Sequence, residues 1–112
     1  MGTNYYLVKT KPTLVAPLHI GKYSGGWKFV FHYVNKYDTD WEVELHDYEE
    51  WVEFLEELMD RKEAVILDEY EEELNFIEFI SMVQKAQRNE NPDNFTYARN
   101  INGYRFETGE FY

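Results

Sequence analysis

The sequence predicts an α+β fold, in which an antiparallel meander sheet has two helices packed on one face. Three observations support this. Short alternating runs occupy the first 45 residues, two amphipathic stretches with capping signals follow, and a turn sequence near the C-terminus joins further β-rich residues. Because domains commonly hold about 100–200 residues, we expect residues 1–112 to form a single domain.

The N-terminal part of the chain has the two-residue periodicity of strands. Residues 5–8 and 18–20 are short β-rich runs, and residues 27–33 alternate after a Ser-Gly-Gly turn. Residues 38–45 alternate again, with an acid at every even position and apolar residues at most odd ones. We expect this last segment to be a strand with an acidic outer face and an apolar inner face.

Two helices are predicted from their N-terminal capping signals and apolar spacing. Asp47 has Glu50 three residues later, and apolar residues then recur at helical spacing, so the first helix should cover residues 48–60. Asn75 has Glu78 three residues later and should cap a second helix that frays near residues 87–89. The apolar stripe of this second helix is expected at Ile77, Ile80 and Val83.

Two more β-rich runs complete the predicted fold. Residues 65–67 (Val-Ile-Leu) are expected as a short buried strand between the helices. Asn102-Gly103 favours a tight turn that leads into residues 104–106.

The charge of the chain is segregated along the sequence. The first 37 residues hold five lysines and no acid, whereas residues 38–78 hold eighteen acids against Arg61 and Lys62. The remaining residues are balanced, and the formal net charge is −11. This distribution must shape the electrostatic field at the surface, whatever the protein does.

Composition and missing motifs exclude several classes of protein. The absence of cysteine excludes a disulfide scaffold, a Cys-ligated zinc finger and a thiol nucleophile. The acidic charge argues against direct nucleic-acid binding, and no apolar run suggests a membrane segment or a signal peptide. No catalytic triad order, phosphate loop or HExxH spacing occurs, so we expect no enzyme.

Histidines on neighbouring predicted strands are a candidate metal site. His19 and His32 would belong to the two strands of one hairpin, and two imidazoles brought opposite each other can ligate zinc. His46 or a carboxylate would complete the ligand shell. The ordinary alternative is that each half-buried histidine is simply hydrogen-bonded within the fold.

The acids themselves are a candidate partner-binding surface. On the predicted strand they would stand about 6.6–6.8 Å apart, similar to phosphates along a nucleic acid. The predicted helix adds acids on one exposed stripe, and the surface as a whole could occupy a groove meant for DNA or RNA. Alternatively the charges only keep the protein in solution. The candidate residues are Asp38, Asp40, Glu42, Glu44, Glu49, Glu53, Glu56, Glu57 and Asp60.

Short motifs along nearly the whole chain resemble a family of small phage and prophage proteins. They are Thr3-Asn4-Tyr5-Tyr6-Leu7, Leu18-His19-Ile20-Gly21-Lys22, Ser24-Gly25-Gly26-Trp27-Lys28-Phe29, Trp51 with Phe54-Leu55, Leu67-Asp68-Glu69-Tyr70, Gly103-Tyr104-Arg105-Phe106 and Gly109-Glu110-Phe111.

The resemblance implies a zinc-ribbon-like relationship. Members of that family typically carry a Cys-x-x-Cys pair shortly before the Leu-His-Ile-Gly-Lys element and look like zinc-binding proteins. This chain has no cysteine there, and the matching histidines are His19 and His32. Either the zinc site is lost, or histidine and carboxylate ligands replace the thiolates.

The resemblance also implies a phage origin and a location in the host cytoplasm. Small acidic phage proteins are often inhibitors of host defence, and the chain is similar to some anti-CRISPR proteins in size and charge. We therefore expect an inhibitor that binds a host type II CRISPR effector nuclease through its acidic surface and blocks DNA loading. The alternative is a small zinc-binding phage protein with a regulatory or structural role; the sequence leaves the oligomeric state open.

Overall fold

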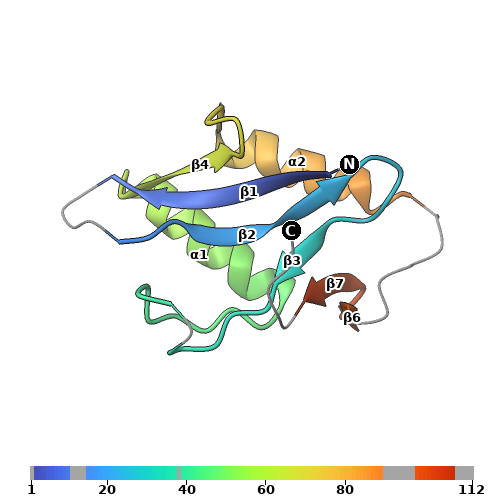
Figure 1. The fold of residues 1–112 in the computed structure, drawn as a ribbon, viewed down its shortest axis with the longest axis horizontal. Helices are drawn as coiled ribbons and strands as arrows, with labels where there is room; N and C mark the ends of the chain where they lie inside the picture. Colours follow the sequence, from blue (N-terminus) through green and yellow to red (C-terminus); the bar gives the residue numbers. More distant parts are fainter. Residues whose placement is uncertain (1, 11–14, 38, 90–97, 108–112) are drawn as a thin grey trace.

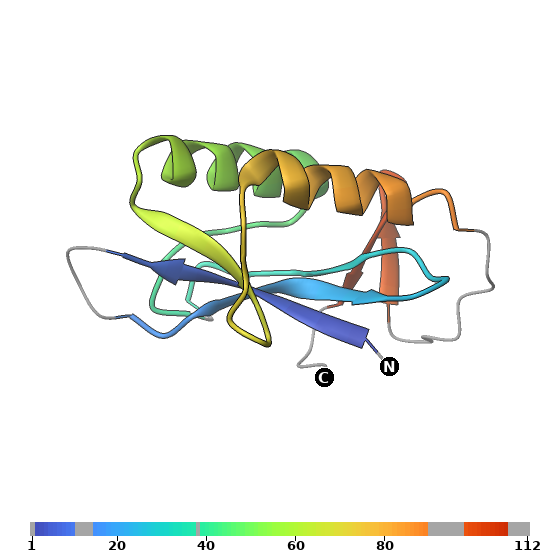
Figure 2. The same ribbon diagram turned by 90° about the horizontal axis from the view of Figure 1, so that it is seen from above.

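The computed structural model describes residues 2–10, 15–37, 39–89 and 98–107, which form one sheet and two helices (Figure 1). Within these residues the seven strands are β1 Gly2–Lys9, β2 Leu18–Ser24, β3 Val30–His32, β4 Ala64–Asp68, β5 Glu73–Leu74, β6 Ala98–Ile101 and β7 Tyr104–Glu107. The helices are α1 Tyr48–Asp60 and α2 Phe76–Ala86. Both helices lie on the same side of the sheet (Figure 2).

The predicted α+β class is confirmed, but the prediction of an antiparallel meander is wrong. The strand order is β5-β4-β1-β2-β3-β7-β6, so β4 adds to the free edge of β1 instead of following β3. β7 pairs with β3 in parallel, which makes the sheet mixed. Parallel neighbours require a crossover, and here the long connection that contains both helices provides it. Phe31 pairs with Phe106 in this register, and their rings stack at 5.4 Å.

Of the predicted strand over residues 38–45, the described part, residues 39–45, does not form a strand. Leu45 makes a single bridge with Val34, and the described residues before it are turns and irregular backbone, with Glu42 at φ 53°. The edge of β3 that this segment would need is occupied by β7. A strand here would also align four acids on one face, where like charges repel. Instead, Trp41 packs edge-on against Phe54 of α1.

Both helix starts agree with the capping signals. The Asp47 side chain accepts a hydrogen bond from the Glu50 backbone N–H at 2.8 Å, and α1 has the predicted bounds. The Glu50 carboxylate reaches back to the His46 N–H, one residue earlier than a standard capping box. Asn75 and Glu78 form the complete reciprocal box at the start of α2.

The core lies between the helices and the sheet. Trp51 and Leu55 of α1 and Phe79 and Val83 of α2 are fully buried. They meet the buried sheet residues Leu7, Leu18, Ile20, Phe31, Ile66 and Phe106. Neither helix of the described residues is long and apolar enough to cross a bilayer.

A polar link fixes α1, α2 and β7 to one another. Gln84 of α2 donates hydrogen bonds to the hydroxyl groups of Tyr48 and Tyr104, at 2.7 and 2.9 Å. The two tyrosine rings stack in parallel with their centroids 3.9 Å apart. The relative positions of the helices are therefore set by specific contacts as well as by apolar packing.

Candidate functional site

Five acids form one exposed stripe along α1. Because successive helical residues are rotated by about 100°, they fall within an arc of about 100° on the side opposite Trp51 and Leu55. All five side chains are exposed. We call them the α1 acidic stripe: Glu49, Glu53, Glu56, Glu57 and Asp60. The last four line a shallow depression of about 500 Å³.

The α1 acidic stripe weakens the helix that carries it. Glu53 has Glu49 and Glu57 four residues away on either side, and such like-charged pairs destabilise a helix by about 0.2–0.5 kcal/mol each. The last turn of α1 contains acids and no base, which is the unfavourable sign for the negative end of a helix dipole. Arg61, just beyond the helix, forms an exposed ion pair with Glu57 at 2.6 Å. Local stability therefore does not explain these residues.

The other predicted partner-binding acids lie in the loop before α1. Asp40, Glu42 and Glu44 are exposed there, and Asp38 lies outside the described residues. Because this segment is not a strand, the regular spacing of 6.6–6.8 Å predicted for these acids is absent. The contact between Trp41 and Phe54, at 6.1 Å between ring centroids, holds the loop against α1. The loop acids therefore lie on a segment that contacts α1.

The acids of the β4–β5 turn face a different direction. This turn projects away from the helices, toward the opposite side of the sheet (Figure 2). Glu69 and Glu71 border a hollow of about 380 Å³ with Tyr6 and Val8, whose side chains alternate with the buried Tyr5 and Leu7 of β1. The acidic block that is continuous in sequence is therefore divided by the fold into two surfaces.

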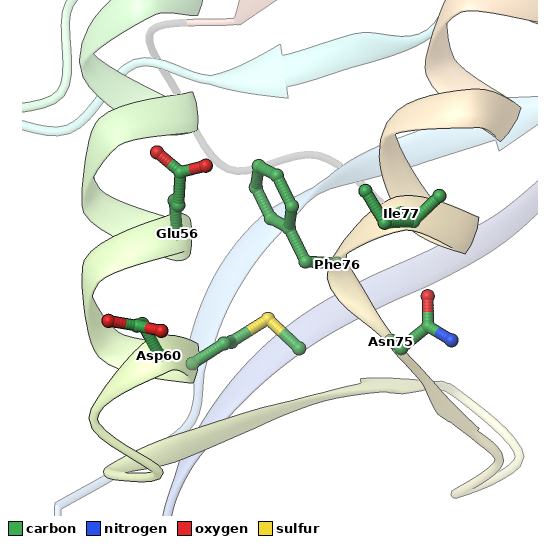
Figure 3. Close-up of a pocket in the computed structure, with 6 residues that line it drawn as sticks. Glu56, Asp60, Asn75, Phe76 and Ile77 are labelled. Atoms are coloured by element: carbon green, nitrogen blue, oxygen red, sulfur yellow. The ribbon is translucent and has the colours of Figure 1, made fainter.

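A groove separates α1 from the start of α2 (Figure 3). Its volume is about 400 Å³, and it is lined by Glu56, Met59, Asp60, Asn75, Phe76 and Ile77. Phe76 and Met59 are partly buried against the core, whereas Ile77 is 69% exposed. We call this the α1–α2 groove.

The placement of Ile77 corrects the predicted apolar stripe of α2. Val83 is buried as predicted and Ile80 is partly buried, but Phe79 and Ala86 complete the buried face in place of Ile77. Ile77 lies on the outer side of the helix. The first turns of α2 contain more apolar residues than one buried face can use, and this excess was the sequence signal for an additional apolar surface.

His19 and His32 lie beside each other, with ring centroids 5.7 Å apart. His19 also stacks on Tyr6, and its Nε2 lies 3.0 Å from the Asn4 side-chain oxygen. Because that oxygen can only accept, Nε2 donates in this contact when it carries a proton. Burial lowers the pKa of His19 from 6.5 to about 4; the neighbouring His32 and Lys22 act in the same direction, whereas a hydrogen bond with the Gly21 backbone acts in the opposite one.

The described residues bring together two ligands of the predicted zinc site. His46, which together with a carboxylate was a predicted candidate to complete the shell, stacks on Tyr33 at 4.3 Å, and its Nε2 lies 3.0 Å from the Asn35 side-chain oxygen. No group of three or more histidines or carboxylates that could hold a metal occurs among residues 2–10, 15–37, 39–89 and 98–107. Structural zinc sites are almost always four-coordinate, so these residues do not supply a complete shell.

Glu107 is a site feature that the sequence analysis missed. Its side chain is 3% exposed, and parallel pairing of β3 with β7 places it beside His32. An acid in a four-residue run with Tyr104 and Phe106 was a weak signal, because edge strands often carry charge. The parallel pairing that buries this acid could not be anticipated from local sequence.

Comparisons with protein-family models, curated proteins and solved structures find no match to this chain.

Proposed function

We propose that this protein is a phage-encoded, anti-CRISPR-type inhibitor that acts in the host cytoplasm. It binds a host type II CRISPR effector nuclease through the α1 acidic stripe and the neighbouring loop acids, and it blocks DNA loading. It acts stoichiometrically and not as an enzyme. The motifs shared with small phage proteins support the phage origin, and the acidic helix supports the mode of binding.

The α1 acidic stripe is the observation that carries the proposal. Five exposed carboxylates lie on one arc of a helix, where they repel one another, and those in the last turn also oppose the helix dipole. Such a surface favours encounter with a basic channel, because opposite charges raise the association rate. Partners that are themselves acidic are repelled. Carboxylates on a rigid helix would thereby occupy positions that nucleic-acid phosphates normally take.

The first experiment is a pull-down of the purified protein with a type II CRISPR nuclease at increasing NaCl concentrations, with and without guide RNA. We expect capture at low salt that weakens steeply as salt rises, because exposed charges are screened. We also expect target DNA to compete with the protein. Absence of capture at low salt would remove this partner.

A charge-matched pair of variants identifies the surface that binds. One variant carries Glu49→Lys, Glu53→Lys and Glu56→Lys on α1; the control carries Glu71→Lys and Glu72→Lys in the β4–β5 turn and Glu73→Lys at the start of β5. Each triple reversal adds six charges and changes the formal net charge from −11 to −5. We expect the α1 variant to lose at least about tenfold in affinity and the control to lose little. Equal losses would mean that total charge matters and the stripe does not.

The second candidate function is zinc binding in a phage protein with a regulatory or structural role. The observation that favours it is the contact between His19 and His32, two residues that the sequence motifs relate to zinc-binding proteins. Elemental analysis and the thermal midpoint with and without chelator test it. Stoichiometric zinc that is lost in a His19→Ala, His32→Ala variant would support it. A metal-free protein whose midpoint ignores chelator would contradict it.

A further inference from the structure

The α1–α2 groove combines apolar and acidic groups in one place. Phe76 lies between the two helices, with Glu56 and Asp60 on the α1 side and Ile77 on the α2 side (Figure 3). Ile77 is one of three large apolar residues with strong exposure among the described residues, at 69%. Large side chains exposed beside a hollow are more typical of binding surfaces than single scattered ones.

The groove is continuous with the α1 acidic stripe. Glu56 and Asp60 line both the groove and the shallow depression that also contains Glu53 and Glu57. A molecule that contacts Glu56 and Asp60 on the stripe therefore lies next to the apolar side chains of Phe76 and Met59. The volume of about 400 Å³ lies in the range of surface sites that take a ligand group, about 300–1,000 Å³.

We propose that the α1–α2 groove binds an apolar side chain of a basic protein segment, in which a neighbouring lysine or arginine pairs with Glu56 or Asp60. This rests on the proposed function and adds to it the chemistry of the contact. The apolar anchor would form the dry centre of the interface, and the ion pairs would form its rim.

Charge complementarity selects this occupant over the others. Nucleic acid is disfavoured because its phosphates would face Glu56 and Asp60. A second copy that used the same face would bring a second acidic stripe against the first, and like-charge contacts at an interface cost several kcal/mol. A basic segment that carries an apolar residue can pair with the acids at the rim of the groove and pack on the apolar residues at its floor.

The proposal predicts a binding energy with two parts that respond differently to salt. Ion pairs at an exposed rim weaken as ionic strength rises, whereas burial of apolar surface does not. An inhibitor that acted by charge alone would lose its affinity at high salt. Here, part of the affinity should persist, and that part should depend on Ile77.

The test uses two labelled peptide probes of equal length and charge, one of alternating lysine and leucine and one of alternating lysine and serine. Binding to the full chain is followed by fluorescence anisotropy, and the site by backbone NMR shifts. We expect the leucine peptide to bind at least about tenfold more tightly, with the largest shifts at Phe76 and Ile77. Equal affinities, or shifts confined to other surfaces, would overturn the proposal.

Ile77→Gln removes the exposed apolar group without adding charge, and Tyr70→Gln is the control, because Tyr70 is 71% exposed on the β4–β5 turn. We expect Ile77→Gln to abolish the preference for the leucine peptide and Tyr70→Gln to preserve it. An unchanged preference in Ile77→Gln would contradict the groove. If sedimentation shows that the free protein self-associates, the occupant of the groove is a second copy of the chain and not a basic segment, and the proposal is overturned.

The peptide experiment and the nuclease pull-down fail independently. Peptide selectivity at the groove without nuclease capture would overturn the proposed partner and retain the groove chemistry. If the nuclease captures the Ile77→Gln and Tyr70→Gln variants equally well, the proposed partner is retained. The proposal that the α1–α2 groove takes part in binding is then overturned.

Discussion

Gly21 lies where three strands meet, and a side chain there has no room. It pairs with Tyr5 on β1 and with Phe31 on β3. A Cβ atom would collide with the carbonyl oxygen of Val30 and would lie 2.5 Å from a ring carbon of Phe29. The glycine of the Leu-His-Ile-Gly-Lys motif therefore has a packing role.

Gly21→Ala should lower the free energy of unfolding by about 1–3 kcal/mol, the usual effect of overpacking. Urea denaturation measures it. Gly25→Ala is the matched control, because a Cβ at Gly25 meets nothing within 4 Å. If both variants have the same urea midpoint of unfolding as the unmodified protein, a side chain at Gly21 is tolerated and the argument for close packing there is wrong.

His19 makes the stability of the fold depend on pH. Its pKa in the folded protein is about 4, below the value of 6.5 for an exposed histidine. The unfolded chain therefore binds the proton more readily, so the contribution is fully present above about pH 6.5 and is lost as the pH falls toward 4. Allowing for its partial exposure, the loss is about 2 kcal/mol.

His19→Gln should remove this dependence while keeping a donor for Asn4. The thermal midpoints of both proteins are measured at pH 7 and pH 4.5. Both proteins contain the same carboxylates, so a difference between their pH responses is due to His19. We expect the unmodified protein to lose more stability on acidification than the variant does. If the thermal midpoints of the two proteins fall equally between pH 7 and pH 4.5, His19 does not make the stability depend on pH.

The helices show how far local sequence determines an element. A capping box depends on residues three positions apart, so Asn75 and Glu78 could be recognised without knowledge of the fold. The segment 38–45 had an equally clear pattern, yet alternation reports which residues share a face and not whether a partner strand exists. β7 takes the edge of β3 in parallel, and that pairing depends on contacts distant in sequence.

The candidate sites divide in the same way. The α1 acidic stripe could be predicted, because its residues and their spacing belong to one helix with clear boundaries. The α1–α2 groove could not, since it requires the start of α2 to lie against the end of α1. Glu107 likewise becomes part of the histidine region only through the pairing of β7 with β3.

Asp60→Lys should stabilise α1 and weaken binding at the same time. A base in the last turn suits the helix dipole, and a lysine four residues after Glu56 forms a favourable pair. We expect a gain of about 1 kcal/mol in urea denaturation and a loss of affinity for the leucine peptide. Asp60→Asn, which removes the charge without reversing it, should give a smaller effect in both assays. A destabilised Asp60→Lys protein would contradict the argument that the stripe opposes stability.

At the scale of the whole molecule, two lysines contact neutral groups, and within the described residues Arg61 is the cation that forms an ion pair with the acidic stripe. The Lys9 ammonium lies 5.7 Å from the centroid of the Trp41 ring. Lys28 donates a hydrogen bond to the Gln87 carbonyl at 2.6 Å, where a cation suits the C-terminal end of α2. The stripe therefore keeps most of its negative charge uncompensated, and this segregation of charge along α1 favours a strong directional field.

This segregation should make salt stabilise the protein while it weakens binding. In the free protein, salt screens repulsion among the acids, so 0.5 M NaCl should raise the thermal midpoint by about 4 °C, corresponding to about 1 kcal/mol for a domain of this size. The triple reversal at Glu49, Glu53 and Glu56 should show a smaller rise, because its formal net charge is −5 instead of −11.

The variant with Glu71→Lys, Glu72→Lys and Glu73→Lys separates local from total repulsion, because it has the same net charge of −5 but an intact stripe. If repulsion within α1 dominates, this control should keep most of the salt response of the unmodified protein. Equal responses in the two variants would assign the effect to total charge. A response as large in the α1 variant as in the unmodified protein would mean that salt acts through the apolar core, since salts can also strengthen burial.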